Sequence, residues 1–295
     1  MRFDAMPRDD FRFMHRLHVR WAEVDMQKIV FNAHYLMYFD TAIAGYWQAL
    51  ALPYVQSMLQ LGGDLYLKKA TVEFNASARM DDRIDVALAC GRIGTSSMVF
   101  RGAIFRGTQP LVTGELVYVF ADPASQTSRP VPQPLRDILV GYEAGESMVR
   151  VETGDWRRLG VDAARIRAEV FVDEQNIPAD MEWDAADATA VHAVAWNRLG
   201  QPLATGRLLK PQAGVARIGR MAVLQPVRGC GVGQSVLHAL LEAAAARGDR
   251  QVLLHAQRDA ENFYRRQGFR ARGDAFDEAG IPHIEMFAGL PLQSP

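Results

Sequence analysis

One carboxylate, Asp25, precedes a long apolar segment within the run RWAEVDMQKIVFNAHYLMYFD, residues 20–40. Residues 33–50 are predicted to form a helix, so Asp25 would lie close to a helix N-terminus, where unpaired N–H groups attract negative charge. A carboxylate there can attack a thioester carbonyl or act as a general base toward water. The backbone N–H of Asn32 could then stabilise the oxyanion. The alternative is a carboxylate that only stabilises the helix dipole.

A glycine-rich turn, Arg-Gly-Cys-Gly-Val-Gly at residues 228–233, joins an apolar strand to an amphipathic helix. Successive N–H groups of such a turn can approach an anion, and the helix dipole and the arginine add to the attraction. A pyrophosphate is the natural ligand. A Walker loop is excluded because no Gly-Lys-Ser/Thr follows, and the dinucleotide-binding pattern would need a parallel βαβ unit with an acidic residue farther on. A turn without a ligand is the alternative.

Two different sets of elements must position these residues. In the first half, a helix that is apolar on all sides and a run of strands indicate an antiparallel sheet wrapped around a central helix. The strands are predicted at residues 17–22, 66–78, 83–92, 97–106 and 111–121. The second half is predicted to be mixed α/β, with helices at 161–174, 231–247 and 260–267 and strands at 190–197, 202–210, 215–223 and 251–256.

A proline-rich segment, residues 122–134, separates the two halves, because its four prolines cannot belong to a regular element. A short helical stretch, 135–142, follows it, and we place the boundary near residue 146. The predicted division is 1–133 for the first domain, 134–147 for a linker and 148–295 for the second domain.

Composition narrows the functional classes. The net charge of −1, without a block of like charge, argues against nucleic acid and anionic membrane surfaces as partners. We find no secretory signal and no apolar stretch long enough to span a bilayer. The two cysteines, Cys90 and Cys230, fall in different halves, which excludes a disulfide framework and a cysteine-built zinc site. A cytoplasmic protein without a metal is expected.

The pattern D-x-x-x-I-V-F-N-A-H-Y-L-x-Y-F-D, which begins at Asp25, resembles the 4-hydroxybenzoyl-CoA thioesterase family of hotdog proteins. The resemblance covers residues 13–133. It implies that Asp25 is catalytic, that the N–H of Asn32 polarises the thioester carbonyl, and that an acyl-CoA is the substrate. One position departs from the family: Lys28 stands where glycine is usual, and this could reshape the entrance or direct a positive charge toward the phosphates of coenzyme A.

The second half resembles the GNAT superfamily of N-acetyltransferases, whose pyrophosphate loop reads R/Q-x-x-G-x-G/A. The residues that carry the resemblance lie in the loop, in the segment LHAQRDAENFYRRQGF (254–269), and in two further segments that begin at Ile166 and Phe276. It implies acetyl-CoA as co-substrate and an amine as acceptor. The residues expected to bind acetyl-CoA are Met221, Ala222, Val223, Arg228, Gly229, Gly231, Val232, Gly233, Gln234 and Asn262.

By the same resemblance, Tyr264 protonates or hydrogen-bonds the departing sulfur, because a phenol has a pKa near ~10 and a thiol one near ~8.5. Glu182 is expected to be the base that deprotonates the amine, with Glu174 and His255 as alternatives. Cys230 is interpreted as a small residue tolerated in the loop.

The sequence therefore predicts an α+β two-domain protein, a hotdog fold followed by a GNAT-type mixed α/β domain. The expected function is bifunctional: hydrolysis of an acyl-CoA thioester and acetyl transfer to an amine. The alternative is an acetyltransferase whose hotdog half binds acyl-CoA and dimerises without turnover. A hotdog dehydratase using His34 with Asp25 is a third hypothesis. A homodimer or homotetramer built through the hotdog domain is expected.

Overall fold

The computed structural model describes residues 7–290, which fall into two compact units that divide between Met148 and Val149. Each unit has its own sheet and is described by itself. No helix within the described range is both long and apolar enough to cross a membrane.

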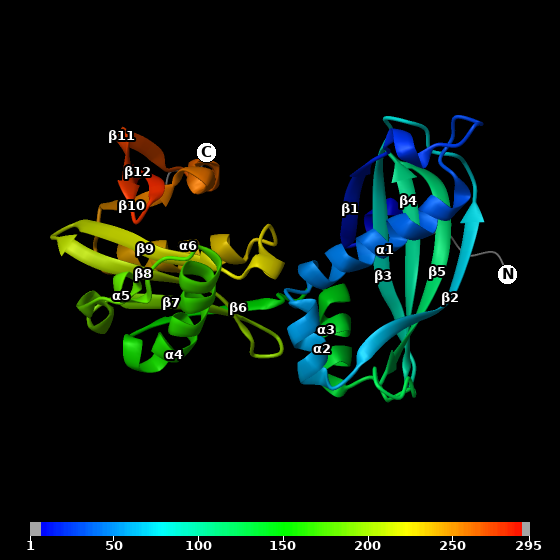
Figure 1. Cartoon of the computed structure of the whole chain (residues 1–295), viewed down its shortest axis with the longest axis horizontal. Coiled ribbons are helices and arrows are strands. Elements are labelled where there is room, and N and C mark those ends of the chain that lie inside the picture. The colour runs from blue at the N-terminus through cyan, green and yellow to red at the C-terminus, as the bar shows by residue number, and fades with distance from the viewer. Residues whose placement is uncertain (1–6, 291–295) are drawn as a thin grey trace. The chain divides into compact units, whose positions relative to one another are not determined.

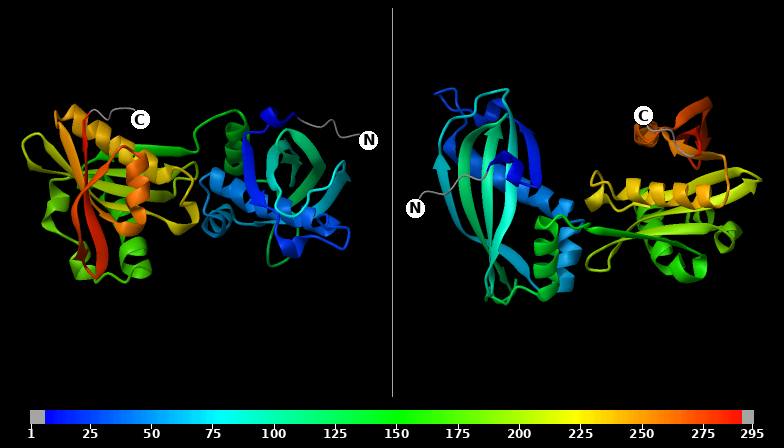
Figure 2. Two further views of the ribbon diagram at one scale, coloured as in Figure 1. Left: turned by 90° about the horizontal axis from the view of Figure 1, so that it is seen from above. Right: turned by 180° about the vertical axis from the view of Figure 1, so that it is seen from behind.

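The first unit is a five-stranded antiparallel sheet with one long helix, α1 (Asn32–Ala49), against it (Figures 1 and 2). The strand order is β1-β3-β4-β5-β2. The strands are β1 (Phe13–His18), β2 (Asp64–Phe74), β3 (Arg83–Ile93), β4 (Ser97–Arg106) and β5 (Gln109–Ala121). The remaining elements are α2 (Tyr54–Leu61), α3 (Gln133–Glu143) and 3-10 turns at Arg8–Asp10 and Trp21–Glu23. The predicted sheet around a central helix is confirmed.

Two glycines let α1 approach the sheet. Gly102 of β4 and Gly114 of β5 lie opposite each other in the register, and both face the fully buried ring of Phe39. A Cβ on Gly102 would lie 2.5 Å from that ring, closer than real contacts allow. The helix can therefore sit directly on the middle of the sheet.

Several local predictions in this unit need correction. The first strand runs over Phe13–His18 rather than 17–22, and the chain then turns through the short helix Trp21–Glu23. Helix α2 was not predicted. Residues 134–147, expected as a linker, contain most of α3, whose Leu135, Ile138, Leu139 and Tyr142 are buried. Because α3 packs on β3, this segment belongs to the first unit.

The second unit is a seven-stranded sheet of order β11-β12-β10-β9-β8-β7-β6, in which only β9 and β10 run parallel. The strands are β6 (Val149–Gly154), β7 (Val191–Asn197), β8 (Pro202–Gln212), β9 (Val215–Val223), β10 (Gln251–Gln257), β11 (Arg270–Glu278) and β12 (Ile281–Gly289). The helices are α4 (Trp156–Arg167), a π-helix (Ala168–Glu174), α5 (Ala179–Glu182), α6 (Val232–Ala246) and α7 (Glu261–Arg266), with 3-10 turns at Ala185–Ala188, Gln225–Val227 and Arg258–Ala260.

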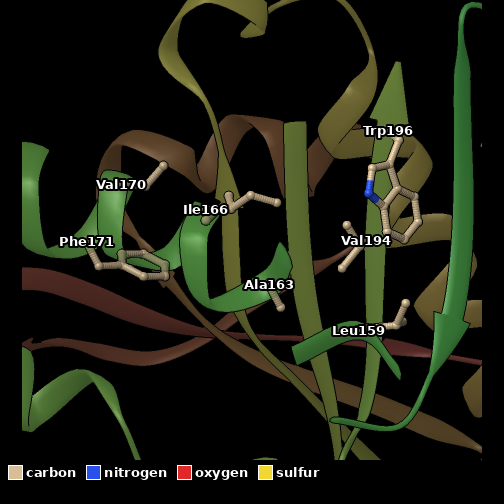
Figure 3. Packing of buried hydrophobic residues seen from close by; sticks show 8 residues of the cluster. Leu159, Ala163, Ile166, Val170, Phe171, Val194 and Trp196 are labelled. Carbon is tan, nitrogen blue, oxygen red and sulfur yellow. The ribbon is translucent and has the colours of Figure 1, made fainter. Parts of the chain in front are cut away.

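The predicted helix 161–174 is two elements. The α-helix α4 begins earlier, where Asp155 caps it by accepting a hydrogen bond from the N–H of Arg158 at 3.0 Å, and it passes into the π-helix at Ala168. One apolar cluster joins both helices to β7 and β9, and in it α4 presents residues at helical spacing (Figure 3). The cluster consists of Leu159, Ala163, Ile166, Val170, Phe171, Val194, Trp196 and Ala222.

The parallel strands β9 and β10 separate partway along their length. They pair only from Val215↔Gln251 to Ile218↔Leu254, although β9 continues to Val223 and β10 to Gln257. Arg220 has a left-handed backbone (φ 51°), and the pairing of β9 with β8 shifts register in this region. Such an irregularity bends a strand away from its neighbour. The ends of both strands therefore have unpaired edges facing each other.

Candidate functional site

The glycine-rich turn presents a row of free amides. Helix α6 begins at Val232 with Gly231 as its N-cap, and no side chain caps it. Gly229 and Gly231 both have positive φ, 84° and 83°, which a residue with a side chain adopts at a cost. Within residues 7–290, none of the N–H groups of residues 229–234 donates a hydrogen bond. These amides and the dipole of α6 form a site for an anion.

Arg228, expected beside that anion, is already paired. Its guanidinium donates two hydrogen bonds to the carboxylate of Glu174, at 2.7 and 2.6 Å, and Nε donates to the carbonyl of Val223 at 2.9 Å. The hydrogen bond from Arg228 holds the pKa of Glu174 below its usual value. Glu174 is thus a partner of Arg228 at the turn rather than a free base.

The backbone of Met221, Ala222 and Val223 lies on the separated part of β9. Ala222 and Val223 pair with Thr205 and Ala204 of β8, while their other edge has no partner strand, because β10 has diverged. This unpaired edge is where an extended arm with amide groups could form strand-like hydrogen bonds.

A cavity of about 400 Å³ lies at this divergence. Met221 of β9, His255 and Gln257 of β10, and Tyr264 of α7 contribute to its lining. Tyr264 is 7% exposed, and burial raises the pKa of its hydroxyl above the usual value, so it holds its proton at neutral pH. Asn262, expected to contact the cofactor arm, lies exposed on α7 and is not among the lining residues.

Glu182 also lines the cavity, but both of its carboxylate oxygens are already engaged. Oε1 accepts from Nε of the buried Arg167 at 2.5 Å, and Oε2 lies 3.2 Å from Nε of Arg220. Arg167 also bonds Asp187 at 2.8 Å, and Arg207 bonds the same carboxylate at 2.8 Å. The sequence did not reveal this network of charges, because its members are spread over α4, α5, the 3-10 turn Ala185–Ala188, β8 and β9.

His255 belongs to a separate polar group on the same cavity. Its Nδ1 lies 3.0 Å from Oε2 of Glu278 on β11 and 3.1 Å from Nη2 of Arg217 on β9. Phe276 contacts the ring edge-on, with centroids 4.8 Å apart. Glu278 and Arg217 were not predicted as site residues, since only strand pairing brings β11 and β9 to His255.

In the first unit, Asp25 begins a tight turn. Its carbonyl accepts from the N–H of Lys28 at 2.9 Å, and its side chain accepts from the N–H of Gln27 at 2.8 Å. Asp25 is partly buried. Lys28 has φ of 62°, the left-handed conformation that glycine adopts most easily, which explains why glycine is usual at this position in the family it resembles.

Asn32 is the first residue of α1, one residue before the predicted start of this helix. Its N–H donates to no acceptor in the described part of the chain, and no side chain caps the helix. The predicted carboxylate and the free amide thus flank one short segment, residues 25–32. A second cavity, of about 340 Å³, lies along α1 and is lined by Ala33, Leu36, Met37, Phe39, Asp40, Leu67, Leu116 and Tyr118.

His34 and Glu23 complete this region. The ring of His34 packs edge-on against Phe31, with centroids 6.1 Å apart. Glu23 is 3% exposed and accepts from the hydroxyl of Tyr38 at 2.7 Å and from the guanidinium and N–H of Arg20. This buried carboxylate was not singled out from the sequence, and its hydrogen bonds brace the segment that leads to Asp25.

Two family models match the chain. The acetyltransferase (GNAT) domain matches residues 158–289, and the thioesterase-like superfamily matches residues 19–139. The uncharacterized N-acetyltransferase YjcF of Bacillus subtilis is 38% identical over 126 residues, which are 42% of this chain and 89% of that protein. Protein ElaA of Escherichia coli is 35% identical over 126 residues, 41% of this chain and 82% of that protein. A 1,4-dihydroxy-2-naphthoyl-CoA thioesterase from Synechocystis, Slr0204, is 21% identical with a TM-score of 0.40, covering 43% of this chain and 95% of its own.

The chain combines two known domain classes, a thioesterase-like hotdog domain followed by a GNAT-type domain, and both resemblances are confirmed. Through its second half it belongs to the GNAT acetyltransferases.

Proposed function

We propose that this protein is a bifunctional coenzyme A-dependent enzyme, which hydrolyses an acyl-CoA thioester in its first unit and transfers an acetyl group from acetyl-CoA to an amine in its second. The observation that carries the proposal is the row of N–H groups at residues 229–234 with no acceptor among the described residues. Such a row fits the pyrophosphate of coenzyme A. The division of the chain after Met148 would place one activity in each unit.

The second unit supplies each element that acetyl transfer requires. The amides of the turn and Arg228 bind the pyrophosphate, and the open edge of Met221, Ala222 and Val223 holds the pantetheine arm by backbone hydrogen bonds. Acetyl-CoA supplies the activated acetyl group when bound. The buried hydroxyl of Tyr264 holds a proton that it can donate to the departing sulfur.

The first unit supplies a carboxylate and a free amide for thioester hydrolysis. Asp25 attacks the thioester carbonyl or activates water, and the N–H of Asn32 stabilises the oxyanion at the start of α1. A non-catalytic acyl-CoA-binding role is the second candidate. Lys28 supports it, since a side chain in a left-handed turn near Asp25 changes the entrance that glycine would leave open.

Proline substitution at Asn32 separates these two roles sharply. Proline removes the N–H together with the Asn side chain, is well tolerated at the first position of a helix, and suits the extended backbone of Phe31 (φ −61°, ψ 134°) before it. If the amide binds the oxyanion, Asn32→Pro lowers kcat for acyl-CoA hydrolysis by about 10²–10³. Asn32→Ala, which keeps the N–H, retains most of the rate.

The assay is release of free thiol from a panel of acyl-CoAs, with and without a mixed amine library. Asp25→Asn is expected to lower amine-independent release by about 10²-fold or more and to spare amine-dependent release. Tyr264→Phe is expected to lower amine-dependent release and to spare amine-independent release. Equal and slow amine-independent release from wild type and Asp25→Asn would leave the first unit as a binding module.

Assembly through the first unit follows from its edge strand. Strand β2 lies at one edge of the sheet and exposes Tyr66, Leu67 and Phe74 to 38%, 42% and 51%. An open edge with apolar side chains favours pairing with a second copy. We therefore propose a homodimer or homotetramer built through the hotdog domain of a cytoplasmic protein. Light scattering during gel filtration that shows a monomer at micromolar concentration would refute this assembly.

A further inference from the structure

We propose that His255 is the base that takes the proton from the acceptor amine, and that Glu278 is the residue that positions it. This inference rests on the proposed acetyl transfer and deepens it. It is carried by the placement of His255 at the divergence of β9 and β10, where it is the first residue of β10 beyond the last pair, Ile218↔Leu254. The side chain lines the cavity that also contains Tyr264.

The hydrogen bond to Glu278 fixes the chemistry of the imidazole. An ionised carboxylate can only accept, so the 3.0 Å contact between Glu278 and Nδ1 favours the tautomer with its proton on Nδ1; the guanidinium of Arg217, which can only donate, then lies 3.1 Å from Nδ1 without a hydrogen bond to it. The neutral ring then carries its lone pair on Nε2, which makes no hydrogen bond within residues 7–290. An imidazole with a carboxylate on one nitrogen and a free lone pair on the other is the arrangement of a general base.

Charged groups surround this imidazole on three strands. Glu278 of β11 and Arg217 of β9 place charges of opposite sign 3.0 and 3.1 Å from Nδ1. Glu285 of β12 lies opposite His255 in the register but is paired with Arg272 at 2.6 Å, and His283 of β12 lies two pairs farther on, opposite Gln257. Charge on the Nδ1 side of the ring is therefore balanced, one carboxylate against one guanidinium.

The other acidic groups near the cavity are bonded elsewhere. Both oxygens of Glu182 are paired with arginines, Glu174 is paired with Arg228, and Asp184 accepts from Arg207 and from the N–H of Ala186. His238, exposed on α6 and outside this cavity, has its Nε2 2.8 Å from Oε1 of Gln267. It is the matched control.

The proton balance of the reaction is complete with these groups. The ammonium group of the acceptor gives one proton to Nε2 of His255, which passes it to solvent. The neutral nitrogen attacks the thioester carbonyl, the N–C bond forms and the C–S bond breaks. The nitrogen loses its second proton as the amide forms. The sulfur takes one proton from Tyr264 and leaves as a thiol. The second proton of the nitrogen then reprotonates Tyr264.

The test is amine-dependent release of coenzyme A from acetyl-CoA over a library of primary alkylamines, with kinetics on the fastest of them. His255→Ala is expected to lower kcat about 10²-fold, and added imidazole is expected to restore part of the loss. Glu278→Gln should lower kcat about tenfold with little change in the KM of the amine. His238→Ala should stay within about threefold of wild type, and calorimetry should show acetyl-CoA binding to His255→Ala within about twofold of wild type.

Three outcomes would overturn the inference. Wild-type kcat in His255→Ala would show that another group accepts the proton. An equal loss in His255→Ala and His238→Ala that imidazole does not restore would indicate a structural role. Absence of amine-dependent release from the wild type would refute the proposed acetyl transfer and this inference with it, which distinguishes that failure from the first two.

Discussion

The carboxylate of Glu174 accepts two hydrogen bonds from the guanidinium of Arg228, at 2.7 and 2.6 Å, beside the turn that starts α6. Bidentate geometry fixes the direction of the guanidinium as well as its position. The pair also places a negative charge next to the amides of residues 229–234, which we propose to hold a pyrophosphate. Glu174 therefore orients Arg228, but its negative charge weakens the attraction of the turn for an anion.

Removal of that negative charge should strengthen binding of coenzyme A. We expect Glu174→Gln to lower the Kd of coenzyme A about threefold at low ionic strength, and less at high salt, because both side chains are partly exposed and screened. Isothermal titration calorimetry at two salt concentrations measures this change. Glu169→Gln is the matched control, since Glu169 is exposed on the same π-helix and loses the same charge. Weaker binding by Glu174→Gln alone would mean that orientation of Arg228 outweighs the charge.

The ion pairs of Asp85 lead us to expect that the stability of the first unit depends on pH. Its carboxylate is 7% exposed and accepts from Arg16, directly opposite on β1, at 2.7 Å and from Arg8 at 2.5 Å. The hydrogen bond from Arg16 holds the pKa of Asp85 below its usual value. Because the folded pKa is the lower one, this stabilisation is present above the unfolded value of about 3.9 and is lost as pH falls through the folded pKa.

Asp85→Asn should therefore lower the Tm of the first unit by about 3–6 °C at neutral pH, and the difference should shrink below about pH 4. Differential scanning calorimetry across this range measures the gap. Asp9→Asn, which neutralises an exposed carboxylate in the preceding 3-10 turn, is the control and should leave Tm nearly unchanged. If the Tm difference between wild type and Asp85→Asn is the same at every pH, the stabilisation does not come from the ionised carboxylate of Asp85.

Gly102 lets α1 lie close to the sheet, and a side chain at this position should destabilise the first unit. An added Cβ would lie 2.5 Å from the buried ring of Phe39, which cannot move aside in a packed core. We expect Gly102→Ala to destabilise the first unit by about 1–3 kcal/mol in urea or thermal unfolding. Gly91→Ala on the neighbouring β3 is the control, because its Cβ would meet only the flexible side chain of Arg101, at 3.2 Å. Similar losses for both variants would indicate a general strand effect.

Local sequence patterns predicted most elements but not the contacts that complete the site. The strands 97–106 and 215–223 are found with the predicted bounds, because alternating apolar residues and turn residues mark them locally. Helix α2 was missed because it is only eight residues long, and so short a segment shows too few helical turns to stand out from the loop around it.

The site shows the same division between local and long-range information. Gly229 and Gly231 could be assigned from sequence, since a turn and a helix start determine what they do. The partners of Glu182 and His255 could not be assigned from the sequence, because Arg167 lies 15 residues from Glu182 and Glu278 lies 23 residues from His255. Whether a carboxylate or an imidazole is free to act depends on such pairings, and those are set by packing and strand register.

Lys28 gives the last prediction, because its backbone conformation is costly for any residue with a side chain. At φ 62° a Cβ crowds the backbone by about 1–2 kcal/mol, whereas glycine has no such penalty but loses more freedom on folding. We expect Lys28→Gly to raise the free energy of unfolding of the first unit by about 0.5–1 kcal/mol. Gln27→Gly, one residue earlier and without positive φ, should lower it. Chemical denaturation followed by tryptophan fluorescence compares the two variants, and a loss of stability in Lys28→Gly would show that the lysine side chain makes a stabilising contact that outweighs its backbone strain.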